Sequence, residues 1–338
     1  MQTSCEKRIP VITLIDVEPD LRLVERVNPA PWEGYEKTHD FFSGLRVELA
    51  ERSGHDVHFA WFYRMDPQIE ETYGSSAWAV ENHPQIIEDI LWQGDDVGLH
   101  THAWRWCPDS RNWITDHGNQ VWINHCMHLS FETFFKSFGR PCGIFRFGDR
   151  WMNQATLELA ERLGAVCDLT IEPGQPETSG MIPGEAVTGR FPDYTRAPRV
   201  IYQPSPGDFL KTGALREDGL VVMPLSTGLV SYKYGRLERL YRHFTRPELL
   251  QPFCATLKWD MPPAHFRSVL DQVLTREGTR YVTLLMRSDA SRDLLQSARL
   301  AENSETLLSY AESHPFVFMH PLEALASLGF SRQVEILL

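Results

Sequence analysis

Short apolar runs rich in β-branched residues alternate along the chain with segments of helical periodicity. Eight of these runs could form strands, and they cover residues 11–15, 57–62, 97–100, 143–147, 165–169, 220–225, 281–286 and 316–319. Runs of this length, bounded by polar or turn residues, are typical of buried strands. Because strands alternate with helices, the pattern favours a parallel sheet, and this many strands can close into a barrel.

Helical spacing is clearest in four segments. Phe41, Phe42, Leu45 and Leu49 recur along one helix face, and Gly54 follows as a suitable C-terminal cap. A second predicted helix begins after Asn153, whose side chain can cap it, and ends at Gly164. Residues 304–314 and 321–328 predict two further helices.

The composition predicts one globular domain over residues 1–338. The chain has 42% hydrophobic and 23% charged residues, which excludes collagen-like and broadly disordered proteins. Residues 173–206 hold seven prolines and break the strand–helix rhythm. We expect an irregular Pro/Gly-rich insertion there, which either shapes a site or is a passive surface excursion.

Charge and hydropathy narrow the range of partners. The formal net charge is −12 and the basic residues are scattered, so we expect no nucleic-acid partner. No run approaches the roughly 20 apolar residues of a membrane span. The first fifteen residues lead directly into charged sequence without a small-residue cleavage site, so they predict a first strand and a cytoplasmic protein with reduced cysteines.

Ionisable residues follow the first and third predicted strands. Asp16, Glu18 and Asp20 come directly after the first, and His100 and His102 close the third. Residues two apart on a strand face the same side, so both imidazoles can converge on one ion. Alone, the histidine pair would more simply be hydrogen-bonded to backbone. The carboxylates at a neighbouring strand end favour a divalent metal ion instead, with zinc as the best match for this ligand set.

Two other strand ends carry arginine, and a second histidine pair lies in a helical segment. Arg146 follows the fourth strand, and Arg287 follows the seventh together with Asp289. His125 and His128 directly precede an aromatic amphipathic segment, which is more typical of a helix-surface pair, with His125 as a reserve metal ligand.

Tryptophan is concentrated around the histidine pair. Eight of the ten tryptophans lie between Trp61 and Trp151, and Trp104 and Trp106 come just after His102. Indole faces pack well against sugar rings, so these two could contact a carbohydrate. Core packing is the alternative use of these side chains.

These strand-end motifs, in this order, resemble the polysaccharide deacetylase family, the NodB-homology carbohydrate esterases. The resemblance covers most of the chain and rests on the segments VITLIDVEPD, DVGLHTHAW, FRFGDRW, NQATLELAERLGAVCDLTIEP, TLLMRSD and FVFMHPLEAL. It implies a distorted (β/α)7 barrel, a divalent metal ion, usually zinc, and hydrolysis of an N-acetyl or O-acetyl group from a sugar.

The first strand and the fourth supply the implied base and its orienting group. Asp16 matches the family's general base, and Arg146 resembles the arginine that orients this aspartate. The family usually places a metal-binding aspartate next to the base, where this chain has Val17. Glu18 would take that role, with Asp20 as the weaker alternative.

The histidine motif also departs from the family pattern. His100 matches the first metal histidine, but Trp104 stands where the second one commonly lies. His102 would then be the second ligand.

The late strand shows the largest departure. The family often presents a histidine there as general acid, and this chain has Arg287. An arginine cannot release its proton in the working pH range, although it could stabilise an oxyanion or bind an anionic group of the substrate. A salt bridge between Arg287 and Asp289 is the other role for this side chain. His320 and Asp289 are the remaining candidates for the proton donor.

Three functions follow. The first is a metal-dependent hydrolase that removes an acyl group from a sugar or sugar-containing precursor, a small molecule or glycan. The second is a metal-independent C–N hydrolase on the same barrel, and the third is a non-catalytic carbohydrate-binding protein. For a cytoplasmic enzyme we expect a soluble precursor as substrate. The sequence leaves the oligomeric state open.

Overall fold

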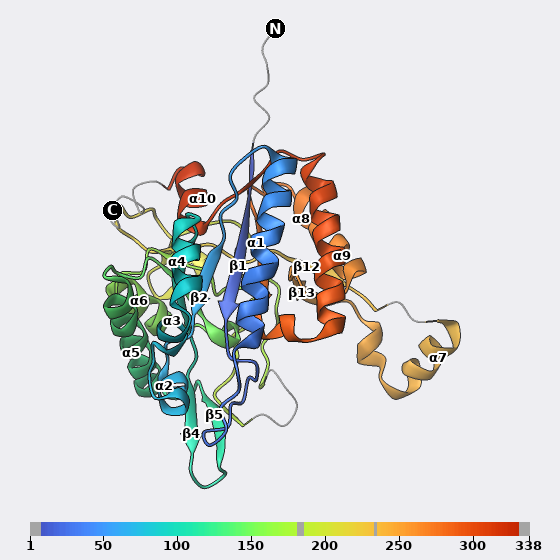
Figure 1. The fold of residues 1–338 in the computed structure, drawn as a ribbon. Helices are drawn as coiled ribbons and strands as arrows, with labels where there is room; N and C mark the ends of the chain where they lie inside the picture. The colour runs from blue at the N-terminus through green and yellow to red at the C-terminus, as the bar shows by residue number, and fades with distance from the viewer. Residues whose placement is uncertain (1–7, 181–185, 233–234, 331–338) are drawn as a thin grey trace.

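A curved, parallel sheet forms the centre of the molecule. The computed structural model describes residues 8–180, 186–232 and 235–330. Neighbouring strands follow the order β11-β7-β6-β3-β2-β1-β14, and β15 pairs with the first residues of β1 (Figure 1). The strands are β1 (Ile9–Val17), β2 (Ala60–Tyr63), β3 (Asp96–Thr101), β6 (Ile144–Phe147), β7 (Cys167–Asp168), β11 (Val221–Val222), β14 (Val282–Arg287) and β15 (Phe316–Phe318). Each coincides with one of the eight predicted runs, which confirms the strand prediction.

Hydrogen bonds close the sheet into a barrel between β11 and β14. The amide of Ser226, just beyond β11, donates to Oγ1 of Thr283 at 2.6 Å. The amide of Leu285 donates to the carbonyl oxygen of Leu257 at 3.0 Å, and the amide of Trp259 donates to the carbonyl oxygen of Leu285 at 2.9 Å. An irregular segment therefore completes the ring, as expected for a distorted (β/α)7 barrel.

Helices cover the outside of the sheet, with α1, α8 and α9 on one side and α5 and α6 on the other (Figure 1). Their bounds are α1 (Glu33–Ser53), α2 (Pro67–Tyr73), α3 (Trp78–Asn82), α4 (Pro84–Trp92), α5 (Gln120–Phe138), α6 (Gln154–Arg162), α7 (Arg236–Thr245), α8 (Pro263–Thr275), α9 (Leu294–Ala311) and α10 (Pro321–Ser327). Gly54 ends α1 in the left-handed conformation, with φ of 70°. The Asn153 side chain accepts from the amide of Thr156 at 2.8 Å, so both predicted caps are confirmed. None of the described helices is both long and apolar enough for a bilayer crossing.

Strand alternation places the polar strand ends inside the barrel. Ile12, Leu14 and Phe62 belong to the apolar cluster that fills the interior. Successive side chains on a strand point to opposite faces, so Asp16 lies on the same face as Ile12 and Leu14. The same argument places His100 inside, because it lies two residues beyond Gly98 of β3, whose Cα faces Ile144 of the interior cluster.

Additional strands lie beyond the carboxyl ends of the sheet, where the hairpin of β4 (Trp104–Cys107) and β5 (Asn112–Asp116) projects at the bottom of Figure 1. Part of the insertion joins this hairpin, since β8 (Val187–Thr188) pairs with β5 in parallel. The remaining short strands are β9 (Pro204–Ser205), β10 (Asp208–Thr212), β12 (Thr227–Val230) and β13 (Phe253–Thr256). The insertion therefore packs beside the carboxyl edge, and residues 181–185 of it lie outside the described part.

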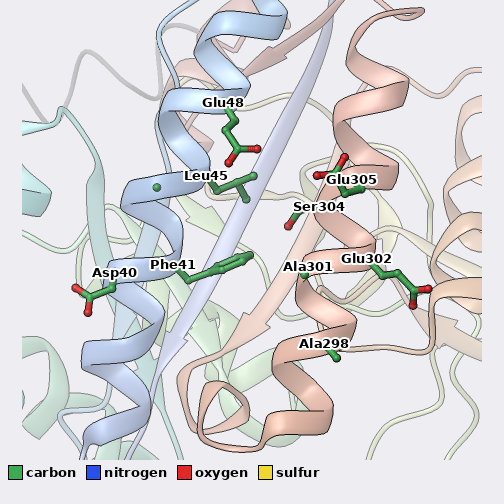
Figure 2. Close-up of a pocket in the computed structure, with 10 residues that line it drawn as sticks. Asp40, Phe41, Leu45, Glu48, Ala298, Ala301, Glu302, Ser304 and Glu305 are labelled. Carbon is green, nitrogen blue, oxygen red and sulfur yellow. The ribbon is translucent and has the colours of Figure 1, made fainter.

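A hollow of about 690 Å³ lies between α1 and α9 (Figure 2). Phe41 and Leu45 contribute apolar surface to it, and Glu48, Glu302 and Glu305 make its rim acidic. It lies between two outer helices, away from the strand ends that carry the histidines. The hollow therefore does not belong to the predicted site.

Candidate metal centre and catalytic site

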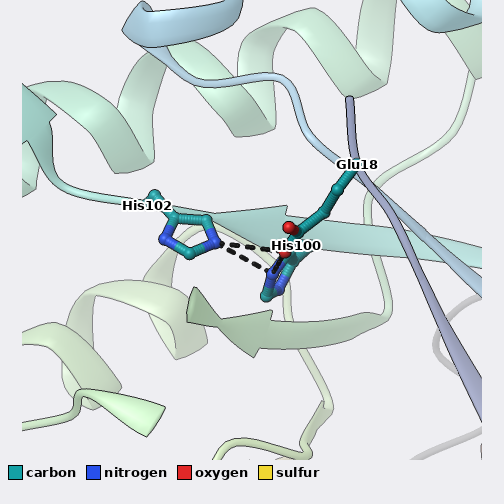
Figure 3. A group of neighbouring side chains, drawn as sticks. All are labelled: Glu18, His100 and His102. Atoms are coloured by element: carbon teal, nitrogen blue, oxygen red, sulfur yellow. Dashed lines mark hydrogen bonds and ion pairs between the residues drawn. The ribbon is translucent and has the colours of Figure 1, made fainter. Parts of the chain in front are cut away.

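Three side chains converge at the carboxyl end of the barrel: Glu18 beyond β1, His100 on β3 and His102 just after it (Figure 3). We call them the metal trio. Glu18 Oε1 lies 2.8 Å from His100 Nε2 and 3.5 Å from His102 Nε2, and the two Nε2 atoms are 3.0 Å apart. All three side chains are buried. Zinc takes such ligands at about 2.0–2.2 Å, so one ion can reach all three after small adjustments.

The chemistry of the trio fits a divalent cation. Two imidazoles and one carboxylate form a known zinc-binding set that leaves a coordination position open for water or substrate. His100 Nδ1 is buried and has no hydrogen-bond partner among the described residues, whereas Nε2 of the same ring faces Glu18 Oε1. Burial lowers the pKa of His100, which keeps this imidazole neutral and able to bind a metal.

A carboxylate behind His102 fixes the orientation of that ring. His102 Nδ1 lies 3.1 Å from Asp149 Oδ2, so an Nδ1–H donated to the carboxylate leaves the Nε2 lone pair directed at Glu18 and His100. Trp104 Nε1 also donates to Asp149 Oδ2, at 2.9 Å. Asp149 is therefore a positioning residue for the trio.

The turn after β6 brings Asp149 to this place. Asp149 adopts the left-handed conformation, with φ of 54°. The residue before it, Gly148, packs so closely on His102 that a Cβ there would lie 2.3 Å from the imidazole. Arg22 forms an ion pair with the other oxygen of Asp149. The sequence analysis assigns no role to Asp149. Its position directly after the fourth predicted strand is the feature that could have identified it as a site residue.

Surrounding charges keep Glu18 ionised. Burial alone would raise the pKa of Glu18, but Arg287 and the two adjacent imidazoles hold it well below its usual range. Glu18 is therefore a carboxylate at neutral pH, as a metal ligand requires.

Asp16 lies beside the trio and is held by Arg146. Arg146 Nε donates to both carboxylate oxygens of Asp16, at 3.1 and 3.2 Å. Its Nη1 donates to the carbonyl oxygen of Leu169 at 3.0 Å, which fixes the guanidinium against the barrel wall. Asp16 Oδ2 is 3.8 Å from His100 Nε2. The predicted partner of the base thus lies where the sequence placed it.

Arg287 contacts two carboxylates. Its Nη2 lies 3.0 Å from Glu18 Oε2 and 2.8 Å from Asp289 Oδ2. The second contact is the salt bridge that the sequence analysis weighed against an anion-binding role. Both carboxylates already contact the guanidinium, so an anionic substrate group would have to compete with them for Arg287.

Three residues considered in the sequence analysis lie outside this cluster. Asp20 Oδ1 accepts from the amide of Gly34 at 2.9 Å, so Asp20 supports the start of α1. His125 is exposed on α5, and His320 precedes α10 beside β15, which pairs with the opposite end of β1. His320 is therefore too far from the trio to act on a ligand there, and His125 is not part of the trio.

The two predicted sugar-contacting tryptophans differ in burial. Trp104 is 1% exposed, donates to Asp149, and has the guanidiniums of Arg22 and Arg64 at 4.6 and 5.3 Å from its ring centroid. Burial and these contacts leave no indole face free for a sugar. The expected sugar contact by Trp104 is therefore wrong, and this side chain packs against Asp149 and the two arginines instead. Trp106 on β4 is half-buried, with the Arg26 guanidinium at 5.2 Å.

Comparison with known proteins identifies the fold. No protein-family model matches the sequence, and no curated protein matches it either. A provisionally assigned glycoside hydrolase/deacetylase from Parabacteroides distasonis aligns with 92% of this chain and 69% of its own, at TM-score 0.51 and 13% identity. The PuuE allantoinase aligns over 98% and 93% of the two chains, at TM-score 0.50 and 11% identity. A provisionally assigned polysaccharide deacetylase from Mycobacterium smegmatis aligns over 100% and 94%, at TM-score 0.48 and 13% identity. The chain therefore shares the fold of the Parabacteroides protein and of the allantoinase, which is the distorted (β/α)7 barrel that the strand-end motifs predicted.

Proposed function

We propose that this protein is a metal-dependent hydrolase that removes an acyl group, in the first place N-acetyl, from a sugar or a sugar-containing compound. The observation that carries the proposal is the convergence of Glu18, His100 and His102 beside Asp16. A ligand set with an adjacent, oriented carboxylate is what hydrolysis by an activated water requires.

The residues of the site have distinct roles in the proposed reaction. A divalent cation, zinc by this ligand set, would lower the pKa of a water molecule and polarise the acyl carbonyl when bound to the trio. Asp16 accepts the proton of the attacking water. Arg146 keeps the carboxylate of Asp16 in a fixed orientation through its two contacts.

The substrate approaches from the side of Arg287 and Asp289. Their side chains are 32% and 21% exposed, while Glu18 and Asp16 are 4% and 2% exposed. The acyl group would lie inward, against the trio, and the sugar outward. Trp106 on the neighbouring hairpin is the proposed aromatic contact for a sugar ring.

A metal-independent C–N hydrolase is the second candidate. The observation in its favour is the Arg287–Glu18 ion pair, which balances the buried carboxylate without any cation. Asp16, Glu18 and His100 would then act by acid–base chemistry alone.

Acetate release with and without chelator tests the proposal. N-acetylated chito-oligosaccharides and O-acetylated xylose are incubated with the protein as purified, after chelation, and after zinc is added back. We expect acetate release that chelation abolishes and zinc restores. Release that is indifferent to chelator would support the metal-independent reaction, and no release from any acylated substrate would contradict both.

A further inference from the structure

The proposed reaction, on which this inference rests, needs a proton donor. When the C–N bond of an amide breaks, the leaving nitrogen must take up a proton, because an amide anion is too poor a leaving group. Arg287 holds its proton too tightly to supply it. His320 lies at the opposite end of the barrel.

His117, just after β5, is also unsuited as the proton donor. His117 is 5% exposed, stacks on Trp151 with ring centroids 5.0 Å apart, and meets the edge of Phe191. This burial lowers the pKa of His117 to about 3. At neutral pH the ring is therefore uncharged and has no acidic proton to donate.

The solvent-exposed side of the site offers a different candidate for the proton donor. With the acyl carbon at the trio and Asp16 buried behind it, the leaving nitrogen has to lie on the solvent side. Asp289 follows β14 on that side and is joined to the trio through one atom, because Arg287 Nη2 contacts both Asp289 Oδ2 and Glu18 Oε2. Its partial exposure lets it exchange protons with water.

We propose that Asp289 is the general acid, donating its carboxyl proton to the leaving nitrogen. In the balanced step, a water oxygen bonds to the acyl carbon and Asp16 takes the water's proton. The C–N bond breaks with its electron pair on nitrogen, which receives the proton of Asp289. Solvent then reprotonates Asp289 and removes the proton from Asp16.

The charges around Asp289 favour its protonated form. The pKa of Asp289 is raised to about 6, mainly by burial and also by the negative charges of Glu18, Asp260 and Asp20, against the lowering effect of Arg287 on β14. A carboxyl that is part protonated near neutral pH suits general acid catalysis.

Substrates with different leaving groups test this role. The phenolate of 4-nitrophenyl acetate leaves without protonation, whereas the amine of an N-acetylated chito-oligosaccharide does not. We expect Asp289→Asn to lower kcat/KM for the amide by roughly 10²-fold or more. The loss of kcat/KM for the ester should be about tenfold smaller than the loss for the amide. Asp289→Glu should restore part of the amide activity.

The pH profile supplies the second readout. Wild-type kcat/KM for the amide should fall as pH rises through the pKa of Asp289, and Asp289→Asn should lack this fall. Asp260→Asn removes a negative neighbour and should move the fall to lower pH. Equal losses on both substrates, or an unchanged profile in Asp289→Asn, would overturn the assignment of Asp289. A wild-type protein inactive on both substrates would instead overturn the proposed function, and this assignment with it.

Discussion

Replacing Asp16 by asparagine is expected to lower kcat/KM for acyl hydrolysis by roughly 10²–10⁴-fold, the range for a lost general base. The amide is nearly isosteric and can still accept from Arg146, but it cannot take a proton from water. Asp16 is not one of the three trio ligands, so metal affinity should change little. Steady-state kinetics and a metal titration on the same preparation separate the two effects.

A matched control for this variant is Asp40→Asn, because Asp40 is 85% exposed on α1. It should leave both kinetics and metal affinity unchanged. If Asp16→Asn keeps activity within a few-fold of wild type, Asp16 is not the base. If it loses metal as well as activity, Asp16 is itself a ligand.

Replacing Asp149 by asparagine is expected to weaken metal binding by about 10–100-fold, the usual cost of losing a carboxylate behind a metal-binding histidine. The carboxylate can only accept a hydrogen bond, and so selects the His102 tautomer with its proton on Nδ1. An asparagine can instead offer an N–H to Nδ1, which leaves the proton on Nε2, where the metal should bind. Competition with a chromogenic chelator measures the change in dissociation constant.

Asp116→Asn is the control for this second variant. Asp116 is a buried carboxylate on β5 that pairs with Arg105, so its replacement tests the general cost of losing an ion pair. Asp116→Asn should leave the metal dissociation constant unchanged. If Asp149→Asn binds metal as wild type does, the contact with His102 serves packing around Trp104 and Arg22 only.

The sequence could predict much of the site because strand geometry is regular. Apolar runs mark the strands, and in a parallel barrel their carboxyl ends meet at one edge. The two-residue period then places Asp16, His100 and Arg146 on the inner face without any knowledge of the loops. Glu18 and His102 follow from the same spacing, which is why the trio could be named in advance.

The remaining contacts depend on loop conformation and side-chain rotamers. The two-residue repeat of a strand does not determine either of these. Asp149 reaches His102 only because the turn after β6 adopts positive φ. The pairing of Arg287 with Glu18 joins residues 269 positions apart. For Trp104 the sequence left sugar contact and core packing open, and the buried ring with the guanidiniums of Arg22 and Arg64 against it favours packing.

Whether Glu18, His100 and His102 hold a metal ion is measured by equilibrium dialysis against zinc followed by elemental analysis of bound metal per chain. Wild type and His102→Ala are compared, with His125→Ala as the control for an exposed histidine outside the trio. We expect one tightly bound ion per chain in wild type and His125→Ala, and loss of tight binding in His102→Ala. A wild-type protein that binds no ion, or a His102→Ala variant that binds it as tightly, would show that the trio is not a metal site.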